Sequence, residues 1–521
     1  MNHNQRKQSR TTLRRPIAGL AAAGLLAVSW TGAYGQVAGP DASPGRSISV
    51  VPRVSISETW TDNVRLSTSD PQHELISELS PGVHIVKEGG RLNGYFDYAL
   101  SEIAYSNGSS PHRTQQALNA FGTLEAVDNW AFLEVSGGIS QQSISALGTP
   151  LLDKNNLSPN QTEVATLRVS PFVRGRVGDW MTYEARWSRA ATNSDGATGT
   201  DVTADDSLLR AAGDSPFRGL GWSALASRQR ADYNSGRATD ADRWNLGLSY
   251  AITPQLRAYA NVGKESNNYT SLDKQQYDTR GVGVNWSVSD ATTLAAQIDH
   301  QFFGDGHAVS FEHRTPRTVW RYTDTKGVSV TPSQAGVGSL GSIYDLLYAQ
   351  FASLEPNPVS RAQLVNSFLQ LNSISPSAVV TSGFLTSAVS LQHRQDLAFA
   401  LLGVRDTVTF MATRSENTRL DTLSTAFDDL SNSSTVIQRG FSVSYAHRLT
   451  PELSIAVLAA QQNTVGTQSA QEARVQSLNV NLTGRVGQKT FASVAVRRIL
   501  SNGSIAPYSE TALTLNLNLQ F

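Results

Sequence analysis

Apolar and polar residues alternate with a period of two along most of this chain, and this pattern constrains its fold more than any other. One stretch places apolar residues at every second position: Trp244, Leu246, Leu248, Tyr250 and Ile252. Another runs from Leu513 to Phe521, with Thr, Asn and Gln between the apolar residues. Successive side chains of a strand point to opposite faces, so the pattern predicts strands with one apolar and one polar face. After Gly35 no apolar run reaches the roughly 18 residues of a membrane-spanning helix.

Two all-β architectures produce such strands, and the connections favour one of them. A soluble sandwich turns the apolar face inward, whereas a transmembrane barrel turns it toward lipid. Short turns are expected at 128–129, 178–179, 218–219, 253–254, 289–290, 450–451 and 487–488. Mostly longer polar segments alternate with them, for example 140–161, 191–206, 264–276 and 415–434. Because outer-membrane barrels have short turns on one rim and long loops on the other, we predict a transmembrane antiparallel up-and-down β-barrel of about 20 to 22 strands.

Aromatic residues support the barrel. Several lie within a few residues of an expected short turn: Trp130, Trp180, Trp222, Tyr250 and Trp286. Trp and Tyr concentrate at membrane–water interfaces, so this set predicts an aromatic girdle on the periplasmic side. The last residue, Phe521, ends an amphipathic strand and resembles the terminal signal that barrel insertion machinery reads. That machinery and outer-membrane lipid are therefore expected partners.

Composition excludes several classes of protein. The 521 residues include 43 basic and 43 acidic side chains, and 17% are charged, 40% are hydrophobic and none is cysteine. An average soluble domain has about 25% charged residues. The neutral balance excludes a basic nucleic-acid binder and an acidic solvating tail. The absence of cysteine excludes disulfides, thiolate metal sites and cysteine nucleophiles.

The N-terminus has the layout of a secretory signal peptide. A basic segment precedes a short apolar stretch and a small-residue cleavage site, which places the cut between Gly35 and Gln36. We therefore expect a signal peptide at 1–35, a periplasmic segment at 36–49 and a barrel at 50–521. The location that follows is the outer membrane of a Gram-negative cell.

One segment departs from the strand pattern. Apolar residues have helical spacing at 343–351 and again at 359–371, with a proline-rich break between them. This spacing predicts two short helices inserted at 323–389. We interpret the insert as a plug or gate of the barrel, and a flexible periplasmic helical hairpin is the alternative.

Strand counting also predicts that the chain crosses from one rim to the other within this insert. If one strand descends over 308–322 and the strand at 390–402 also descends, the chain must return to the outer rim between them. The insert would achieve this either as an unrecognised strand near 377–386 or as a plug that threads the lumen.

Patterns typical of enzymes are weak in this chain. Asp299-His300 and Glu312-His313 lie on either side of a tight turn, and their side chains are of the kinds that bind metals or transfer protons. Adjacent residues of a strand point to opposite faces, however, which favours ordinary wall residues. We predict no catalytic residue.

Ligand-binding patterns are equally sparse. The segments 106–108 and 501–503, both Ser-Asn-Gly, faintly resemble barrel phospholipase segments, but Asn-Gly is usually a turn pair. Asp428 and Asp429 fall short of the roughly six to eight oxygens that Ca²⁺ requires. We therefore predict no metal site and no cofactor.

Several short segments resemble the PEP-CTERM system-associated outer membrane protein family. They are 55–64 (SISETWTDNV), 78–83 (ELSPGV), the helical insert, 391–394 (LQHR) and 400–409 (ALLGVRDTVT). The resemblance implies an outer-membrane barrel encoded beside exopolysaccharide and exosortase machinery in Gram-negative bacteria. It brings no catalytic or binding residues. Because the chain lacks a PEP-CTERM sorting tail, the resemblance makes it a partner of that system and not a sorted substrate.

These observations predict a pore or export component for polar solute or exopolysaccharide. Lumen-facing Asn, Gln, Ser, Thr, Arg and aromatic residues suit carbohydrate, which hydrogen-bonds and stacks without net charge. Polysaccharide and exopolysaccharide export proteins are the expected partners. A non-transporting outer-membrane scaffold for surface-polymer assembly is the alternative, and a barrel hydrolase is a minor one.

Overall fold

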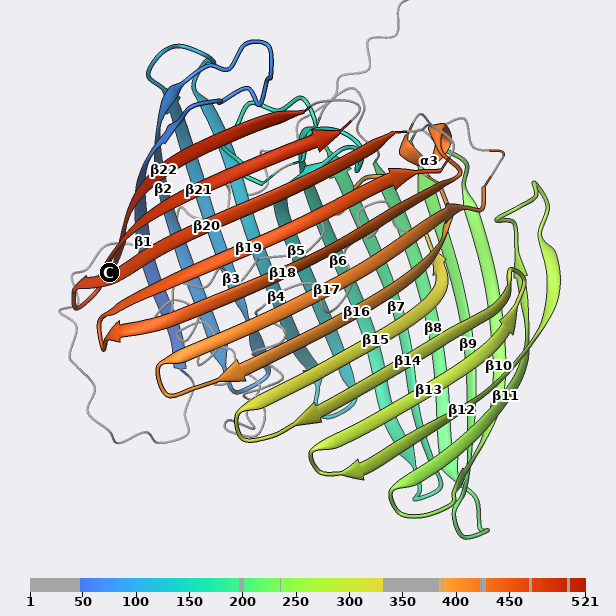
Figure 1. The fold of residues 1–521 in the computed structure, drawn as a ribbon. Helices are drawn as coiled ribbons and strands as arrows, with labels where there is room; N and C mark the ends of the chain where they lie inside the picture. The colour runs from blue at the N-terminus through green and yellow to red at the C-terminus, as the bar shows by residue number, and fades with distance from the viewer. Residues whose placement is uncertain are drawn as a thin grey trace, which may run out of the picture. The chain divides into compact units, whose positions relative to one another are not determined.

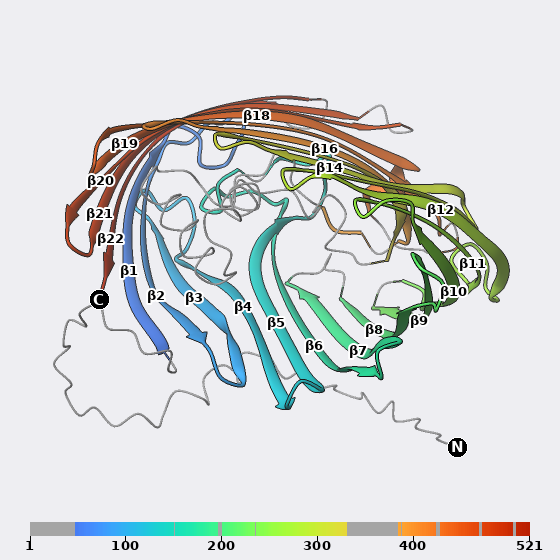
Figure 2. The same ribbon diagram turned by 90° about the horizontal axis from the view of Figure 1, so that it is seen from below.

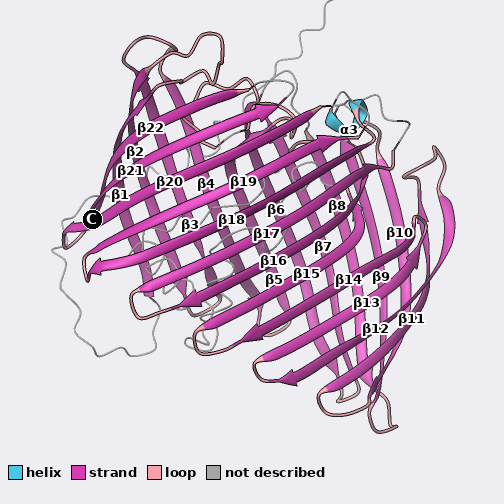
Figure 3. Ribbon diagram, viewed as in Figure 1, coloured by secondary structure: helices cyan, strands magenta, loops and turns pink. Residues whose placement is uncertain are grey.

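The described chain forms one sheet of 22 strands closed into a barrel (Figures 1 and 3). The computed structural model describes residues 47–150, 152–195, 201–234, 236–330, 384–386, 388–421, 423, 428–467, 471–503 and 507–521. The strands are β1 (Ser47–Thr61), β2 (Glu74–Glu88), β3 (Leu92–Tyr105), β4 (Arg113–Val127), β5 (Ala131–Ser143), β6 (Gln161–Val177), β7 (Met181–Ser194), β8 (Val202–Asp214), β9 (Leu220–Tyr233), β10 (Thr239–Ala251), β11 (Leu256–Asn267), β12 (Gln275–Ser289), β13 (Thr292–Gln301), β14 (Gly304–Arg314), β15 (Thr318–Ser329), β16 (Ser390–Leu402), β17 (Asp406–Arg419), β18 (Thr435–Thr450), β19 (Leu453–Gly466), β20 (Glu472–Gly487), β21 (Thr490–Gly503) and β22 (Tyr508–Gln520). The predicted antiparallel barrel and its strand number are confirmed.

The barrel closes where the last strand meets the first. β22 pairs antiparallel with β1 from Arg53 opposite Gln520 to Thr61 opposite Ala512. On the lumen side of this seam, the Asn516 amide donates to the Ser55 hydroxyl at 2.8 Å. Closure satisfies backbone groups that an open sheet would leave bare, which is what a sheet within hydrocarbon requires.

Each strand separates an apolar outer face from a polar inner face, as the alternation predicts. On β22 the outward Leu513 and Leu515 are 40% and 49% exposed, whereas Thr514 between them reaches across the lumen face to Thr59 at 3.0 Å. Leucines this exposed on the outer face would be unfavourable in water. In a membrane they contact lipid.

The aromatic residues predicted as a girdle lie near the short turns. Four of them are 43% to 54% exposed on the barrel surface: Trp130, Trp180, Tyr250 and Trp286. The Trp180 ring lies 6.3 Å from the ring of Trp222, which joins the same group. Their position at one end of the apolar band fits an interfacial role.

Connections differ strongly between the two rims. At one rim, called here the short-turn rim, every described connection has two to five residues, from 290–291 to 215–219. The other, the long-loop rim, has loops such as 62–73, 144–160 and 420–434, although 302–303 is short. The predicted segregation of turns is confirmed, and the long loops are shorter than predicted because the strands extend into them.

The strand expected over 308–322 is wrong. Those residues belong to two strands, β14 and β15, which reverse at the turn 315–317 on the short-turn rim. Pro316 explains the reversal, because proline lacks the N–H that a strand interior needs. β15 therefore ends, and β16 begins, at the long-loop rim, so no returning strand or threaded plug is needed.

The insert predicted at 323–389 is also corrected at its start. Residues 323–329 are part of β15, and the connection begins at residue 330. Within the 377–386 stretch, Phe384 forms an isolated bridge with Ser143 and is not part of a barrel strand. The helices predicted at 343–351 and 359–371 lie outside the described residues.

The described residues contain little helix. The short α3 (Asp429–Asn432) lies in the loop between β17 and β18 (Figure 3). No helix among the described residues is long and apolar enough to span a membrane. The expected signal peptide at 1–35 and cleavage residues Gly35 and Gln36 lie outside the described residues, and the first strand begins at Ser47, slightly before the predicted 50.

Candidate functional site: a polar lumen bridged by loops at one rim

The lumen wall carries paired charges. Arg53 donates to Asp97 through two nitrogens at 2.8 and 2.5 Å, and His84 contacts the same carboxylate at 2.9 Å. Farther around the wall, Arg243 lies 2.9 Å from Glu265. Guanidinium groups hold such pairs in fixed geometry. The wall is thus rich in hydrogen-bonding groups while these charges offset one another.

Aromatic rings join arginines on the lumen face of β5, β6 and β7. The rings of Phe132 and Phe172 stack with centroids 5.0 Å apart and an interplanar angle of 14°. Arg174 lies 4.4 Å from the Phe132 ring centre, and Arg186 lies 3.9 Å from that of Phe172. Glu134 is 3.4 Å from Arg186. Apolar ring surface beside planar donors is the kind of wall that a neutral, hydroxyl-rich solute can contact.

The loop 144–160, called here the strap, folds against the lumen wall. Lys154 reaches Glu78 of β2 at 2.5 Å, and the Asn155 amide donates to the same carboxylate at 2.8 Å. The hydroxyl of Tyr105 on β3 donates to the Asn155 carbonyl at 2.8 Å. The strap starts from β5 and ends in β6, so these contacts show that it extends across β4 and β3 as far as β2.

A second group of contacts, called here the latch, ties the strap to β21 and β22. Asp153 lies 2.5 Å from Arg497, which also contacts Glu510 at 3.1 Å. Asn156 donates to Glu510 at 2.9 Å. Burial alone would raise the pKa of Asp153, but the Arg497 guanidinium and the Asn155 N–H hold it below its ordinary value. The latch therefore favours the ionised carboxylate.

The strap also meets a loop from the opposite wall. The Ser145 hydroxyl and the Ala146 N–H donate to Asp429 at 2.7 and 2.6 Å. Asp429 belongs to α3 between β17 and β18, about half the circumference away from β5 and β6 in the 22-strand ring. Burial raises the pKa of Asp429 even though these donors oppose the rise. Apolar side chains fill the junction: Ala146, Phe384, Leu430 and Val436. Figure 2 shows the strap, in teal, inside the ring of strands.

Two more loops join this closure. Arg237, between β9 and β10, donates to carbonyls of Asn268 and Ser271 in the β11–β12 loop at 2.6 and 3.0 Å. It also lies 3.4 Å from Asp421 in the β17–β18 loop. Loops 144–160, 234–238, 268–274 and 420–434 thus form a connected set, called here the mouth loops. Their contacts bridge the long-loop rim without adding strands to the sheet.

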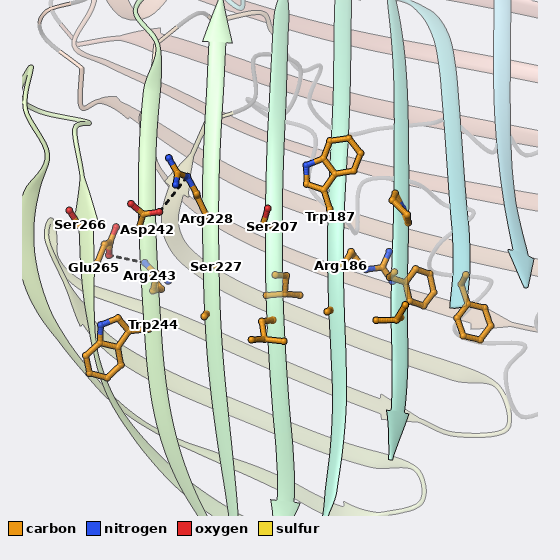
Figure 4. Close-up of a pocket in the computed structure, with 18 of the residues that line it drawn as sticks. Arg186, Trp187, Ser207, Ser227, Arg228, Asp242, Arg243, Trp244, Glu265 and Ser266 are labelled. Atoms are coloured by element: carbon orange, nitrogen blue, oxygen red, sulfur yellow. Dashed lines mark hydrogen bonds and ion pairs between the residues drawn. The ribbon is translucent and has the colours of Figure 1, made fainter. Parts of the chain in front are cut away.

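A groove of about 1070 Å³ lies outside the lumen (Figure 4). Trp187 and Trp244 line it, as do Arg228 and Asp242, whose charged groups are 3.7 Å apart. Its floor contains small residues: Ala185, Ser207 and Ala226. Trp244 shares a face with the exposed Leu246, so this groove opens toward lipid. It is not a path through the barrel.

The two acid–histidine pairs are not brought together. Asp299 accepts from Asn261 at 3.3 Å on the lumen face, whereas the neighbouring His300 points outward and contacts Asp305 at 2.9 Å. Likewise, Glu312 faces the lumen and His313 does not, because each pair occupies adjacent positions of one strand.

The other residues singled out from sequence have structural roles. Gly108 has a φ of +71°, so the 106–108 segment is a turn, and 501–503 ends β21. Asp428 caps α3 by accepting from the Ser431 N–H at 2.9 Å. The Phe521 N–H donates to the Pro52 carbonyl at 2.9 Å, which continues the seam.

Sequence reasoning missed the latch and the strap contacts. Only the length of the loop and the dense polar run Asp153-Lys154-Asn155-Asn156 could have drawn attention to it. Their partners lie on strands dozens to hundreds of positions away.

Comparisons with solved structures return other barrels. The chain is similar to the siderophore receptor PirA from Pseudomonas aeruginosa, with 8% identity, 91% of this chain and 80% of that chain covered, and a TM-score of 0.44. It is also similar to the FrpB iron transporter from Neisseria meningitidis, with 10% identity, 90% and 82% covered, and a TM-score of 0.48. The outer membrane protein opdK from Pseudomonas aeruginosa is similar as well, with 9% identity, 91% of this chain and 99% of that chain covered, and a TM-score of 0.34. No family model matches the chain, and no curated protein sequence matches it.

The features of the structure itself define the class. An even-numbered closed antiparallel sheet, an outward apolar band, and segregated short and long connections together make this chain a transmembrane β-barrel of the outer-membrane type.

The latch gives a test of strap closure. Leu157→Cys in this cysteine-free chain places a single thiol where Leu157 packs against Val64, Ile76 and Ile103. Adding Arg497→Gln leaves two buried carboxylates without their cation, which costs about 3–5 kcal/mol. We expect the thiol to react at least about tenfold faster with a water-soluble maleimide, since this cost greatly exceeds the 1.4 kcal/mol of a tenfold change.

Arg498→Gln is the matched control for this experiment. Arg498 neighbours Arg497 but is on the opposite face, where it contacts Asp62 at 3.8 Å. Equal labelling in both variants would show that the latch does not hold the strap.

Proposed function

We propose that this protein is a gated outer-membrane pore for polar solute or polymer, with exopolysaccharide as the favoured cargo. The carrying observation is that loops from opposite walls meet across the long-loop rim, where α3 contacts the strap through Asp429 and a small apolar cluster. Contacts such as Ser145–Asp429 can separate while the barrel stays intact, because no ladder hydrogen bond is lost. A polar lumen with such a closure suits intermittent passage.

The nature of the wall supports a neutral, hydroxyl-rich cargo. Its charges occur as pairs, as with Arg243 and Glu265, and therefore create little net field to select an ion. The ring stack of Phe132 and Phe172 provides apolar surface among donors. Carbohydrate uses both kinds of contact.

The resemblance to PEP-CTERM system-associated outer membrane proteins supports exopolysaccharide in particular. On this proposal, the chain is exported by a cleaved signal peptide, inserted by the barrel machinery and coupled to polysaccharide export proteins. A non-transporting scaffold for surface-polymer assembly is the second candidate, and the loops that bridge the long-loop rim are the observation that favours it.

Locking the mouth separates the two candidates. Ala146→Cys with Leu430→Cys joins two side chains of one buried cluster, and the chain has no other cysteine. In planar bilayers we expect the wild type to show discrete openings. The oxidised double variant should stay shut until a reductant cleaves the disulfide, because the strap can no longer leave α3.

The single variant Ala146→Cys controls for the substitution and should open in either redox state. A wild-type barrel that passes no current under any condition, at any voltage or pH, would rule out the pore and leave the scaffold.

Cargo is tested in the producing cell. If the barrel exports exopolysaccharide, its deletion abolishes secreted polymer while polymer accumulates inside the cell, and the reduced double variant restores secretion. Normal secretion from the deletion strain would contradict this cargo, and loss of surface attachment with polymer still released would point to the scaffold.

A further inference from the structure

Two histidines and an aspartate converge on the outer face of the barrel. His307 of β14 and His393 of β16 both direct Nε2 to the same oxygen of Asp324 on β15, at 2.8 and 2.9 Å. The imidazole rings are perpendicular, with centroids 5.2 Å apart. Three adjacent strands thus each supply one ligand type that divalent transition metals accept.

The position of this cluster makes it accessible. On β15 the outward Trp320 is 42% exposed, and Asp324 lies four residues farther toward the long-loop rim, with His307 and His393 both in register with Lys326, two residues beyond Asp324. The side chains of His307 and His393 are each 28% exposed, and that of Asp324 is 17% exposed. All three side chains are therefore partly accessible from the outer surface of the barrel.

Asp324 is held by groups other than the histidines. The Gln395 amide donates to its second oxygen at 3.0 Å, and the Tyr322 hydroxyl donates there at 3.2 Å. These contacts fix the carboxylate and leave its first oxygen for the two imidazoles. Support of this kind around a ligand is typical of metal sites, where it orients the coordinating atom.

We propose that His307, Asp324 and His393 form a binding site for a divalent transition ion, with Zn²⁺ as the representative. Their ligand atoms all lie within 4.8 Å of one another. Tetrahedral Zn²⁺ with bonds near 2.0–2.1 Å keeps its ligand atoms about 3.3 Å apart. The two nitrogen–oxygen separations therefore need to widen by only a few tenths of an ångström, and water supplies the fourth position.

Charged neighbours tune this site. Lys326 is in register with both histidines and shares their face, so its positive charge opposes a cation. Glu416 is in register with His393 and contributes a negative charge, although Arg414 lies 3.2 Å from it. Removing the Lys326 charge should consequently strengthen binding.

Bound metal would clamp three strands at the base of the longest connection. Asp324 lies five residues before the end of β15 at Ser329, and His393 lies three residues after the start of β16 at Ser390. The ion would fix the points where the chain leaves and rejoins the sheet. This clamp is independent of whether the lumen conducts.

Calorimetric titration of the full-length barrel in detergent micelles with Zn²⁺ tests the proposal. We expect one ion per chain, with binding weakened by on the order of tenfold or more in His307→Ala, His393→Ala and Asp324→Asn. Lys326→Gln should bind more tightly. Titration with Co²⁺ should give the visible absorption of nitrogen–oxygen coordination in the wild type and lose it in the three variants.

His300→Ala is the matched control, because His300 also faces outward beside a carboxylate, Asp305, yet lies outside the cluster. It should bind as the wild type does. Heat-modifiable mobility on gels verifies that every variant is folded. No saturable binding by folded wild type, or equal affinity in the wild type and the three ligand variants, would overturn the proposal.

Discussion

Closure of the sheet between β22 and β1 is the contact on which the rest of the structure depends. Hydrocarbon offers no partner for a backbone N–H or C=O, so a sheet within it must leave no edge. The seam from Arg53–Gln520 to Thr61–Ala512 satisfies this requirement with residues more than 450 positions apart. Once it forms, each strand has a fixed inner and outer face.

Two different environments on these faces explain the composition. Outward residues such as Leu515 meet lipid, while inward ones such as Asn516 meet the lumen, so a 40% hydrophobic fraction is the average of two unlike surfaces. The low charged fraction has the same cause, since most lipid-facing positions, such as Leu513, Leu515 and Leu517, carry no charge. The length of the chain therefore reflects the number of strands in one barrel and not a number of separate domains.

Local patterns were sufficient to predict the strands and turns. Alternation from Trp244 to Ile252 and turn pairs such as Thr253-Pro254 depend on neighbouring residues alone, and the structure confirms them. The same local approach failed at Pro316, where a short turn was taken for the interior of one strand. Because of that single error, the segment 323–389 was expected to bring the chain back to the outer rim, which the topology does not require.

Contacts across the barrel were beyond sequence reasoning. Asp153 and Arg497 are 344 positions apart, and nothing near either residue indicates the other. The same holds for His307, Asp324 and His393, which approach one another only because β14, β15 and β16 have a particular register. A local pattern can identify a wall residue, but register decides which wall residues meet.

The mouth loops then connect fold to function. A hydrogen-bonded ladder forms the wall, and side-chain contacts such as Ser145–Asp429 join loops across the mouth, so separating these loops need not disturb the seam. Under the proposed function, this arrangement lets the mouth open while the barrel stays intact. It depends entirely on the assignment of inner and outer faces.

Spin labelling along β22 tests that assignment most directly. Single cysteines at 513–518 carry a nitroxide in bilayer-reconstituted protein, and their relaxation by oxygen, which concentrates in lipid, and by a water-soluble nickel complex is compared. The account requires oxygen to dominate at 513, 515 and 517 and the nickel complex at 514, 516 and 518. Uniform accessibility at all six positions would contradict it.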